Sequence, residues 1–180
     1  MAKKVIVGVL AVLLVLGVFI ATRPAHFRIT RSAQIHAPSA VLFPLINDFH
    51  RWPEWSPWDK LDPNMKKTYS GAPAGTGAVY AWAGNDKAGE GRMTITDSKP
   101  SQLVSVQLEF FKPFAATNRA TFTLTPSAAG TQLTWSMEGD NGFMAKAFNV
   151  VMNMDSLVGK DFEQGLSNLD RIASAPPASP

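Results

Sequence analysis

The chain has 180 residues, of which 46% are hydrophobic and 17% charged, so its composition excludes an intrinsically disordered protein. Because it contains no cysteine, disulfide frameworks, thiolate metal sites and cysteine nucleophiles are excluded as well. The 13 glycines and 13 prolines show no collagen-like period, which excludes a fibrous protein. The length accommodates one globular domain and one short additional segment.

An uncharged apolar run, Val5–Thr22 (VIVGVLAVLLVLGVFIAT), lies near the start of the chain. About 18 helical residues extend about 27 Å, close to the ~30 Å hydrocarbon core of a bilayer. The run is apolar on every face, which disfavours a helix buried in a soluble core. We therefore expect residues 1–25 to form a single-pass membrane anchor, so that the membrane is one partner of the chain.

A cleaved signal peptide is the alternative interpretation of this run, and it requires small residues at positions −3 and −1. Cleavage after Ala21 would place Phe19 at −3. Cleavage after Ala25 would place Arg23 there. Both sites are poor, so the sequence favours an uncleaved anchor. Basic residues are balanced on the two sides of the run, and we expect the domain outside the cytoplasm because a very short preceding tail is typical of a signal-anchor.

The charge balance argues against a nucleic-acid partner. Lys3, Lys4 and Arg23 flank the apolar run, and without them the 17 Lys and Arg fall to 14, equal to the 14 Asp and Glu. The rest of the chain is therefore formally neutral, and its longest basic run is Lys66–Lys67. A nucleic-acid-binding surface needs a basic patch or stripe, so none is expected. The sequence gives no indication of the oligomeric state.

Residues 26–174 are predicted to form one domain, followed by a Pro-rich, disordered tail over residues 175–180. Alternating hydrophobicity predicts a first strand over His26–Ile35, after which Ser39 can cap a short helix. The prolines of residues 48–62 exclude a long helix and indicate short helical turns. Segments of period-2 hydrophobicity, separated by turn-like residues, then predict six or seven strands in an antiparallel meander. The segments after the first strand are residues 65–70, 77–84, 89–97, 102–112, 117–126 and 131–139.

Apolar residues three and four positions apart indicate a long C-terminal helix from Phe143 to Ala173, with Asp140 or Asn141 as its cap. Only the sheet can cover the apolar stripe of this helix, which gives an α+β domain. Because a sheet of six or seven strands curls strongly, we expect a gap between its concave face and the helix. Such a gap, lined by large apolar side chains, is a usual place for a small-molecule site.

Four stretches carry a resemblance to a known family: Ile35-His36-Ala37-Pro38, Ile46-Asn47-Asp48, Trp52-Pro53-x-Trp55-x-Pro57-Trp58 and Met154-Asp155-x-x-Val158-Gly159-Lys160-Asp161-Phe162-Glu163-x-Gly165-Leu166-x-x-Leu169. With them the chain resembles the START-like, helix-grip superfamily (SRPBCC) and, within it, proteins of the polyketide cyclase/dehydrase type. The resemblance spans residues 27–173. It implies a helix-grip fold, in which a curved antiparallel sheet wraps around a long C-terminal helix and two short helices follow the first strand. It also implies a hydrophobic cavity. The resemblance indicates the fold and the cavity more firmly than it indicates any catalysed reaction.

Alternation along the strands and the stripe of the last helix predict which side chains face this cavity. Plain core packing is the alternative for each of them. Residues of the opposite parity, among them Arg92, Gln107, Glu109 and Glu138, are expected to face solvent. The predicted ligand-binding residues are Tyr80, Trp82, Met93, Ile95, Val106, Leu108, Phe110, Phe122, Trp135, Met137, Met154, Val158 and Phe162.

Patterns typical of catalysis or metal binding are absent from the sequence. It contains no Gly-x-Ser-x-Gly and no His-Glu-x-x-His. The three histidines, His26, His36 and His50, are dispersed, and the loop carboxylates Asp59 and Asp62 are expected to be solvated. We therefore expect no catalytic residue, no metal ion and no cofactor.

Two aromatic clusters allow both a functional and a structural interpretation. For Trp52, Trp55 and Trp58, packing of the short helices onto the sheet is favoured over a pocket wall or lid. The segment Phe110–Phe114 (FFKPF) is expected at a hairpin tip, where it could contact a bilayer or guard the mouth of the cavity. Asp48 is expected to cap the turn that follows it.

The sequence thus predicts a membrane-tethered domain that binds a hydrophobic or lipid-like small molecule between the sheet and the last helix. The first alternative is an enzyme like a polyketide cyclase or dehydratase, acting in the same cavity, as the resemblance permits. The second is a non-catalytic scaffold domain whose core is filled by its own side chains.

Overall fold

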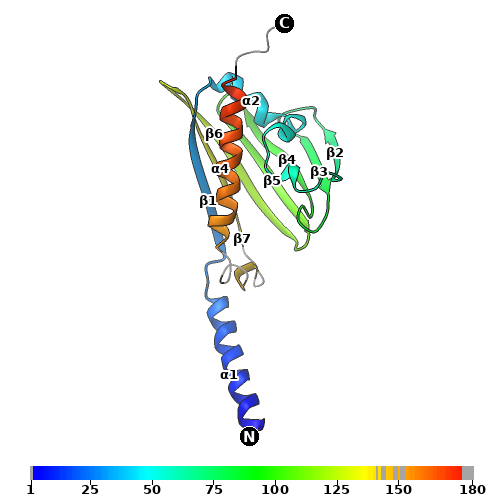
Figure 1. Ribbon diagram of the computed structural model, residues 1–180, viewed down its shortest axis with the longest axis vertical. Coiled ribbons are helices and arrows are strands. Elements are labelled where there is room, and N and C mark those ends of the chain that lie inside the picture. The colour runs from blue at the N-terminus through cyan, green and yellow to red at the C-terminus, as the bar shows by residue number, and fades with distance from the viewer. Residues whose placement is uncertain (1, 141, 143–144, 148–149, 151–152, 176–180) are drawn as a thin grey trace.

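The computed structural model describes residues 2–140, 142, 145–147, 150 and 153–175. The first element, α1 (Ala2–Ala21), projects away from one end of a domain built on a curved sheet (Figure 1). Within the described residues, α1 is the one helix long and apolar enough to cross a membrane by length and composition. Apart from Ile20, its large apolar side chains are exposed. It therefore contributes almost nothing to the core of the domain.

Seven strands form one antiparallel sheet in the order β1-β7-β6-β5-β4-β3-β2. Every neighbouring pair is antiparallel, because the strands from β2 onward form a meander whose last strand returns to lie beside β1. The predicted meander and the predicted first strand are confirmed. The bounds are β1 His26–Ile35, β2 Lys66–Gly71, β3 Ala78–Ala83, β4 Glu90–Lys99, β5 Leu103–Lys112, β6 Ala116–Ser127 and β7 Gly130–Asp140.

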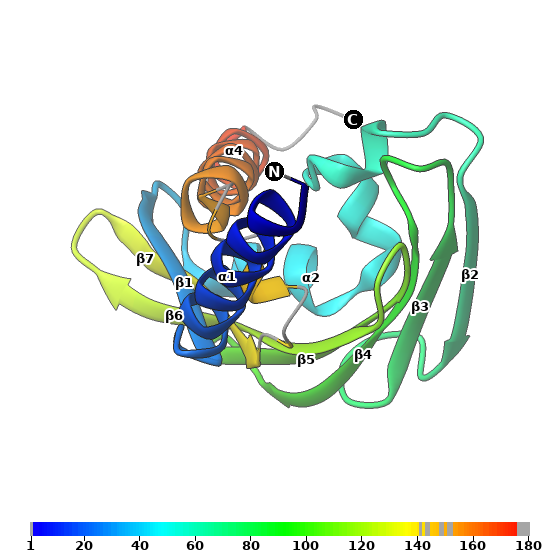
Figure 2. The ribbon, with the colours of Figure 1, turned by 90° about the horizontal axis from the view of Figure 1, so that it is seen from below.

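The helices of the domain lie on the concave side of this sheet, as the view from below shows (Figure 2). They are α2 (Ser39–Asn47), the short 3₁₀ helices η1 (Phe49–Glu54) and η2 (Trp58–Lys60), and α4 (Met154–Ala173). Together with the sheet they form a helix-grip fold of the α+β class. The helix α4 contacts β1 at one edge, whereas α2 lies against β6 near the middle of the sheet.

Two predicted helix starts are wrong. Residues 145–147 and 150 are helical, but the last helix begins anew at Met154, because the Asn153 side chain caps it by accepting the backbone N–H of Ser156 at 3.1 Å. Asp140, one predicted cap, is the last residue of β7; the other candidate, Asn141, and Phe143 lie outside the described residues. Residues 176–180 of the predicted tail also lie outside them.

The cap of α2 differs as well. Pro38 occupies the cap position with extended backbone angles, and Ser39 is the first helical residue. The Ser39 hydroxyl instead lies 3.0 Å from that of Thr131 on β7, and both are buried. This hydroxyl pair satisfies two buried polar groups where α2 begins on the sheet.

An ion-pair cluster holds the first turns of α4 over β1. The Arg31 guanidinium on β1 donates to Glu163 at 2.8 Å and to Asp155 at 3.1 Å. The hydrogen bonds that Arg31 donates to Asp155, and next those to Glu163, raise the pKa of Arg31 above its ordinary value. A β-carbon at Gly159 would overlap the Arg31 side chain, so the glycine permits this close approach. The helix is thereby held at one edge of the sheet.

Candidate functional site on the concave face

The predicted cavity residues all lie on β3 to β7 or on α4, and none of them is exposed. They divide into two groups by their burial. The buried group is Tyr80, Met93, Ile95, Val106, Phe122, Trp135, Met137 and Phe162. The partly exposed group is Trp82, Leu108, Phe110, Met154 and Val158.

One half of the concave face, which we call the closed half, is filled by aromatic rings. Trp135 of β7 stacks on Phe162 of α4 with ring centroids 4.1 Å apart and an interplanar angle of 6°. Phe122 of β6 approaches Trp135 to 4.7 Å, and Trp55 lies edge-on to both. A β-carbon at Gly165 would lie 2.8 Å from the Trp135 ring, so this glycine is required for close contact. Side chains therefore fill the space beneath the C-terminal half of α4, where the sequence predicts a gap.

The tryptophans that follow α2 belong to this packing. The indole nitrogens of Trp52 and Trp55 donate to the carbonyls of Ile46 and Leu45 at 2.9 and 2.8 Å. Both side chains are buried, whereas Trp58 is partly buried with its ring 5.6 Å from that of Trp135. The structural interpretation of this cluster, packing onto the sheet, therefore accounts for all three rings.

The other half of the concave face, which we call the open half, lies at the end of the sheet next to α1. The register pairs Leu108 of β5 with Asn118 of β6, and Asn118 with Gly139 of β7, which in turn pairs with Phe27 near the start of β1. Each of these inward-facing residues is partly exposed. Apolar side chains in this half are therefore only partly covered.

A row of stacked aromatic rings, which we call the aromatic row, crosses the open half from β2 to β5. Tyr69 lies 5.2 Å from Tyr80, and Tyr80 lies 6.1 Å from Trp82. Trp82 meets Phe110 edge-on at 5.8 Å, and its indole nitrogen donates to the Ala88 carbonyl at 3.0 Å. An aromatic row of this kind offers apolar contact area with few polar groups.

A buried ion pair at the end of the aromatic row was missed from the sequence. Asp59 of η2 pairs with Lys67 of β2, and the exposed fractions of these side chains are 7% and 25%. The prediction that Asp59 is solvated is therefore wrong. Lys67 shares the parity of the inward-facing Tyr69, so strand alternation could have placed it on the concave face. Asp59 carries no comparable signal, because its position depends on how η2 folds against β2.

Both tyrosines of the chain belong to this group. Burial, and next the charge of Asp59, raise the pKa of Tyr69 and of Tyr80 above the ordinary value. Within the described part of the chain, Trp135 Nε1 is the one fully buried side-chain polar atom without a hydrogen-bond partner. Neither tyrosine hydroxyl is therefore both fully buried and without a partner. The open half thus combines apolar rings with two hydroxyls and one ion pair.

The three histidines lie apart from one another, but the His50 imidazole stacks on the Tyr69 ring of the aromatic row with ring centroids 4.2 Å apart. Their Nδ1 atoms approach Asp140, Asp170 and Asp48 at 3.4, 3.2 and 2.9 Å, and all three imidazoles are more than half exposed. Asp48 caps η1 by accepting the His50 backbone N–H at 2.9 Å, as predicted. Among the described residues, no three His, Asp or Glu side chains are grouped as a metal site requires.

Residues of the opposite parity lie on the convex face. Arg92 of β4 and Glu109 of β5 form an ion pair of 2.7 Å there, and Gln107 is exposed. Glu138 lies 3.9 Å from Arg119 on the same face. Irregularities in the β4–β5 register do not turn Arg92 toward the concave side.

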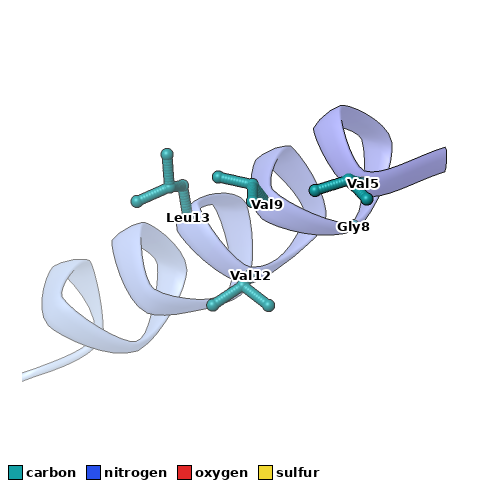
Figure 3. A pocket seen from close by; sticks show the side chains of 5 residues that line it. All are labelled: Val5, Gly8, Val9, Val12 and Leu13. Atoms are coloured by element: carbon teal, nitrogen blue, oxygen red, sulfur yellow. The ribbon is translucent and has the colours of Figure 1, made fainter. Parts of the chain in front are cut away.

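Two hollows stand out on the described residues, and neither lies beneath α4. One, of about 350 Å³, is a shallow dent on the exposed face of α1 between Val5 and Leu13 (Figure 3). The other, of about 380 Å³, lies where α1 meets the domain. It reaches Phe27, so it adjoins the open half. Its lining consists of Phe19, Arg23, Pro24, His26, Phe27, Lys146 and Val150.

Comparisons with known proteins agree with this architecture. The family model for "Polyketide cyclase / dehydrase and lipid transport" matches residues 26–173. The chain is similar to protein CV1439 from Chromobacterium violaceum, with a TM-score of 0.58 and 15% identity over 85% of this chain and 100% of that chain. It is similar to the KanY protein, with a TM-score of 0.60 and 15% identity over 83% and 99% of the two chains. Protein Ms6760 from Mycobacterium smegmatis gives a TM-score of 0.57 and 19% identity over 83% and 91%. At these identities the likeness concerns the fold alone, and no curated protein matches the chain.

Proposed function

Because the chain belongs to the polyketide cyclase/dehydrase and lipid transport family, we propose that it is a membrane-anchored SRPBCC-type domain that binds a hydrophobic, lipid-like small molecule. We place this molecule on the open half of the concave face. The observation that carries the proposal is the partial exposure of Trp82, Leu108 and Phe110, inward-facing residues of a sheet whose closed half is fully packed.

Burial of apolar surface supplies the affinity in this proposal. Each 100 Å² of apolar area removed from water contributes about 2.5 kcal/mol. The aromatic row provides the contact area, and the hydroxyls of Tyr69 and Tyr80 provide hydrogen bonds that orient a polar group of the ligand. The expected ligand is therefore largely apolar with one or two oxygen atoms.

The helix α1 supports the membrane part of the proposal. Its apolar side chains are exposed on all sides, and their burial in hydrocarbon accounts for a composition that would be costly in water. We place the domain on the extracytoplasmic side, and a cleaved signal peptide is the competing account of the same helix. Because the chain has no cysteine, a single introduced cysteine and a membrane-impermeant maleimide report the side on intact cells.

Native mass spectrometry of the full chain, released from lipid nanodiscs, tests ligand binding. The expected result is a co-purifying apolar molecule that is identified after solvent extraction. Leu108→Trp, which adds bulk to the open half, should remove this adduct. The matched control Gln107→Trp, on the opposite face of the same strand, should retain it. A wild-type chain without any adduct would support a scaffold domain with a filled core and contradict the proposal.

A second candidate function, an enzyme like a cyclase or dehydratase, is favoured by the ionisable pair Asp59–Lys67 beside the aromatic row. A carboxylate and an ammonium group near tyrosine hydroxyls can move protons on a bound ligand. The extracted ligand distinguishes the two functions. When the extracted molecule is incubated with the purified chain, an enzyme would convert it into a chemically different product, and Asp59→Asn would abolish this conversion. A binding protein would leave the molecule chemically unchanged.

A further inference from the structure

The turn between β5 and β6 lies at the same end of the sheet as the membrane-anchor candidate α1. Phe110 pairs with Ala116 to close this hairpin, and two residues further along β6 Asn118 pairs with Gly139. Gly139 in turn pairs with Phe27, the second residue of β1. The hairpin tip and the start of β1 therefore share one end of the domain, the end from which α1 projects (Figure 1).

Exposed apolar side chains gather at this end. Phe111 and Phe114 of the hairpin tip are 48% and 64% exposed, and Leu157 in the first turns of α4 is 44% exposed. Single exposed apolar residues are ordinary on any protein surface. Two phenylalanines beside a lysine at one tip are less so, because aromatic and basic residues together suit the interface of a bilayer.

The short connection between α1 and β1 keeps this end close to the bilayer. Only residues 22–25 separate the two elements, and four extended residues reach at most about 14 Å. Further contacts shorten the connection, since Lys146 donates to the Ala21 carbonyl at 3.2 Å and the Arg23 guanidinium lies over the Phe19 ring at 4.2 Å. The interfacial layer of a bilayer is itself about 5–7 Å thick on each side. The hairpin tip is therefore within reach of lipid headgroups whenever α1 spans.

We propose that the β5–β6 tip inserts Phe111 and Phe114 into the bilayer interface as a second membrane contact. This inference rests on the proposed function of α1 as an anchor. The occupant of the exposed tip is thus lipid and not another protein. Two separate contacts fix the orientation of the domain, whereas a single flexible tether would leave it free to turn. The open half then faces the bilayer, so a hydrophobic molecule reaches the aromatic row without crossing bulk water.

The absence of cysteine allows a direct test on the full chain with single nitroxide labels. Three exposed alanines provide matched sites: Ala11 in α1, Ala115 in the β5–β6 tip and Ala128 in the β6–β7 tip at the opposite end. Each Ala→Cys variant is labelled in vesicles of phosphatidylcholine and phosphatidylglycerol. Electron paramagnetic resonance then compares the accessibility of each label to oxygen, which concentrates in lipid, and to a water-soluble nickel chelate.

The expected result is preferential oxygen accessibility at residues 11 and 115 and preferential nickel accessibility at residue 128. In a Phe111→Ser/Phe114→Ser background, the label at residue 115 should move to the aqueous profile while that at residue 11 stays unchanged. If the label at residue 115 shows the same aqueous accessibility as the label at residue 128 while the label at residue 11 lies in lipid, the docking proposal is overturned and the anchor is not. An aqueous label at residue 11 overturns the anchor and the docking together.

Discussion

The two halves of the concave face are built from the same strands with the same alternation of side chains, yet they differ in how far other side chains cover them. In the closed half, Trp55, Phe122 and Phe162 are at most 1% exposed. In the open half, Trp82, Leu108 and Phe110 face the same way and remain partly exposed. The difference arises from the helices packed on the concave face and not from the strands. Strand alternation decides which face is apolar, whereas the placement of the helices decides which parts of that face are covered and which stay partly exposed.

Two local features limit the cover. Asn153 caps α4, so 13 residues separate the start of the helix at Met154 from the end of β7 at Asp140. The ion pairs of Arg31 with Asp155 and Glu163 then hold its first turns over β1, away from β5. The helix therefore covers the β1 edge and leaves Trp82, Leu108 and Phe110 on β3 and β5 partly exposed.

The largest expected effect comes from truncating one phenylalanine in each half. Phe162→Ala should lower the free energy of unfolding by about 3–5 kcal/mol, because it leaves a cavity against Trp135. Phe110→Ala should cost less than about 1.5 kcal/mol, because its side chain is partly exposed already. Urea denaturation of the full chain in one detergent gives both values. Equal losses would contradict the division into a closed and an open half.

Removing the carboxylate of the buried ion pair should have the next largest effect on stability. Asp59→Asn leaves Lys67 partly buried without its partner, at a cost of about 2 kcal/mol in the free energy of unfolding. Asp59→Leu/Lys67→Met should recover most of this loss, since no unpaired charge remains. A double variant as unstable as the single one would show that packing around η2, not the unpaired charge, sets the cost.

Gly165→Ala should destabilise the closed half by about 1 kcal/mol. The added methyl group overpacks against the Trp135 ring, at a cost of about 1–3 kcal/mol. The better helix propensity of alanine offsets up to about 1 kcal/mol of this. Thermal unfolding of the full chain measures the net change in stability. A variant more stable than the wild type would show that the rings of the closed half move aside to accommodate the added methyl group.

The smallest expected effect is spectroscopic. Tyr69 and Tyr80 are the only tyrosines, so tyrosinate absorbance reports on the open half alone. Burial first, and then Asp59, raise both pKa values above 10.0, so neither tyrosine should ionise at its ordinary pH in the folded chain. Unfolded chains lose these protons first as the pH rises, so this contribution to stability is complete below about pH 10 and falls above it. Asp59→Asn should move both titrations to lower pH; unchanged titrations would show that the carboxylate lies too far from the rings to act on them.

Sequence patterns were sufficient for the sheet and for the direction of its side chains. The first strand has the predicted bounds, and the later strands differ from prediction by only a few residues, because strands and turns leave local signals in period and in glycine and proline. Three features depended on contacts between distant segments. The closure beneath Gly165 requires Trp135 and Phe162 to stack, the inward turn of Asp59 requires η2 to fold against β2, and the start of α4 depends on the Asn153 side chain. None of these contacts follows from hydrophobic period alone.

Photo-cross-linking with photo-leucine in place of leucine tests most directly whether the open half holds a ligand. The chain is labelled throughout, irradiated in its native membrane and digested, and small-molecule adducts are located by peptide mass spectrometry. Leucines of α1 serve as the internal control for contact with lipid. A ligand on the open half should give an adduct on Leu108 and none on Leu124 or Leu133, which are 3% and 0% exposed in the closed half. Adducts on Leu124 or Leu133, or a Leu108 without any adduct while α1 is modified, would contradict it.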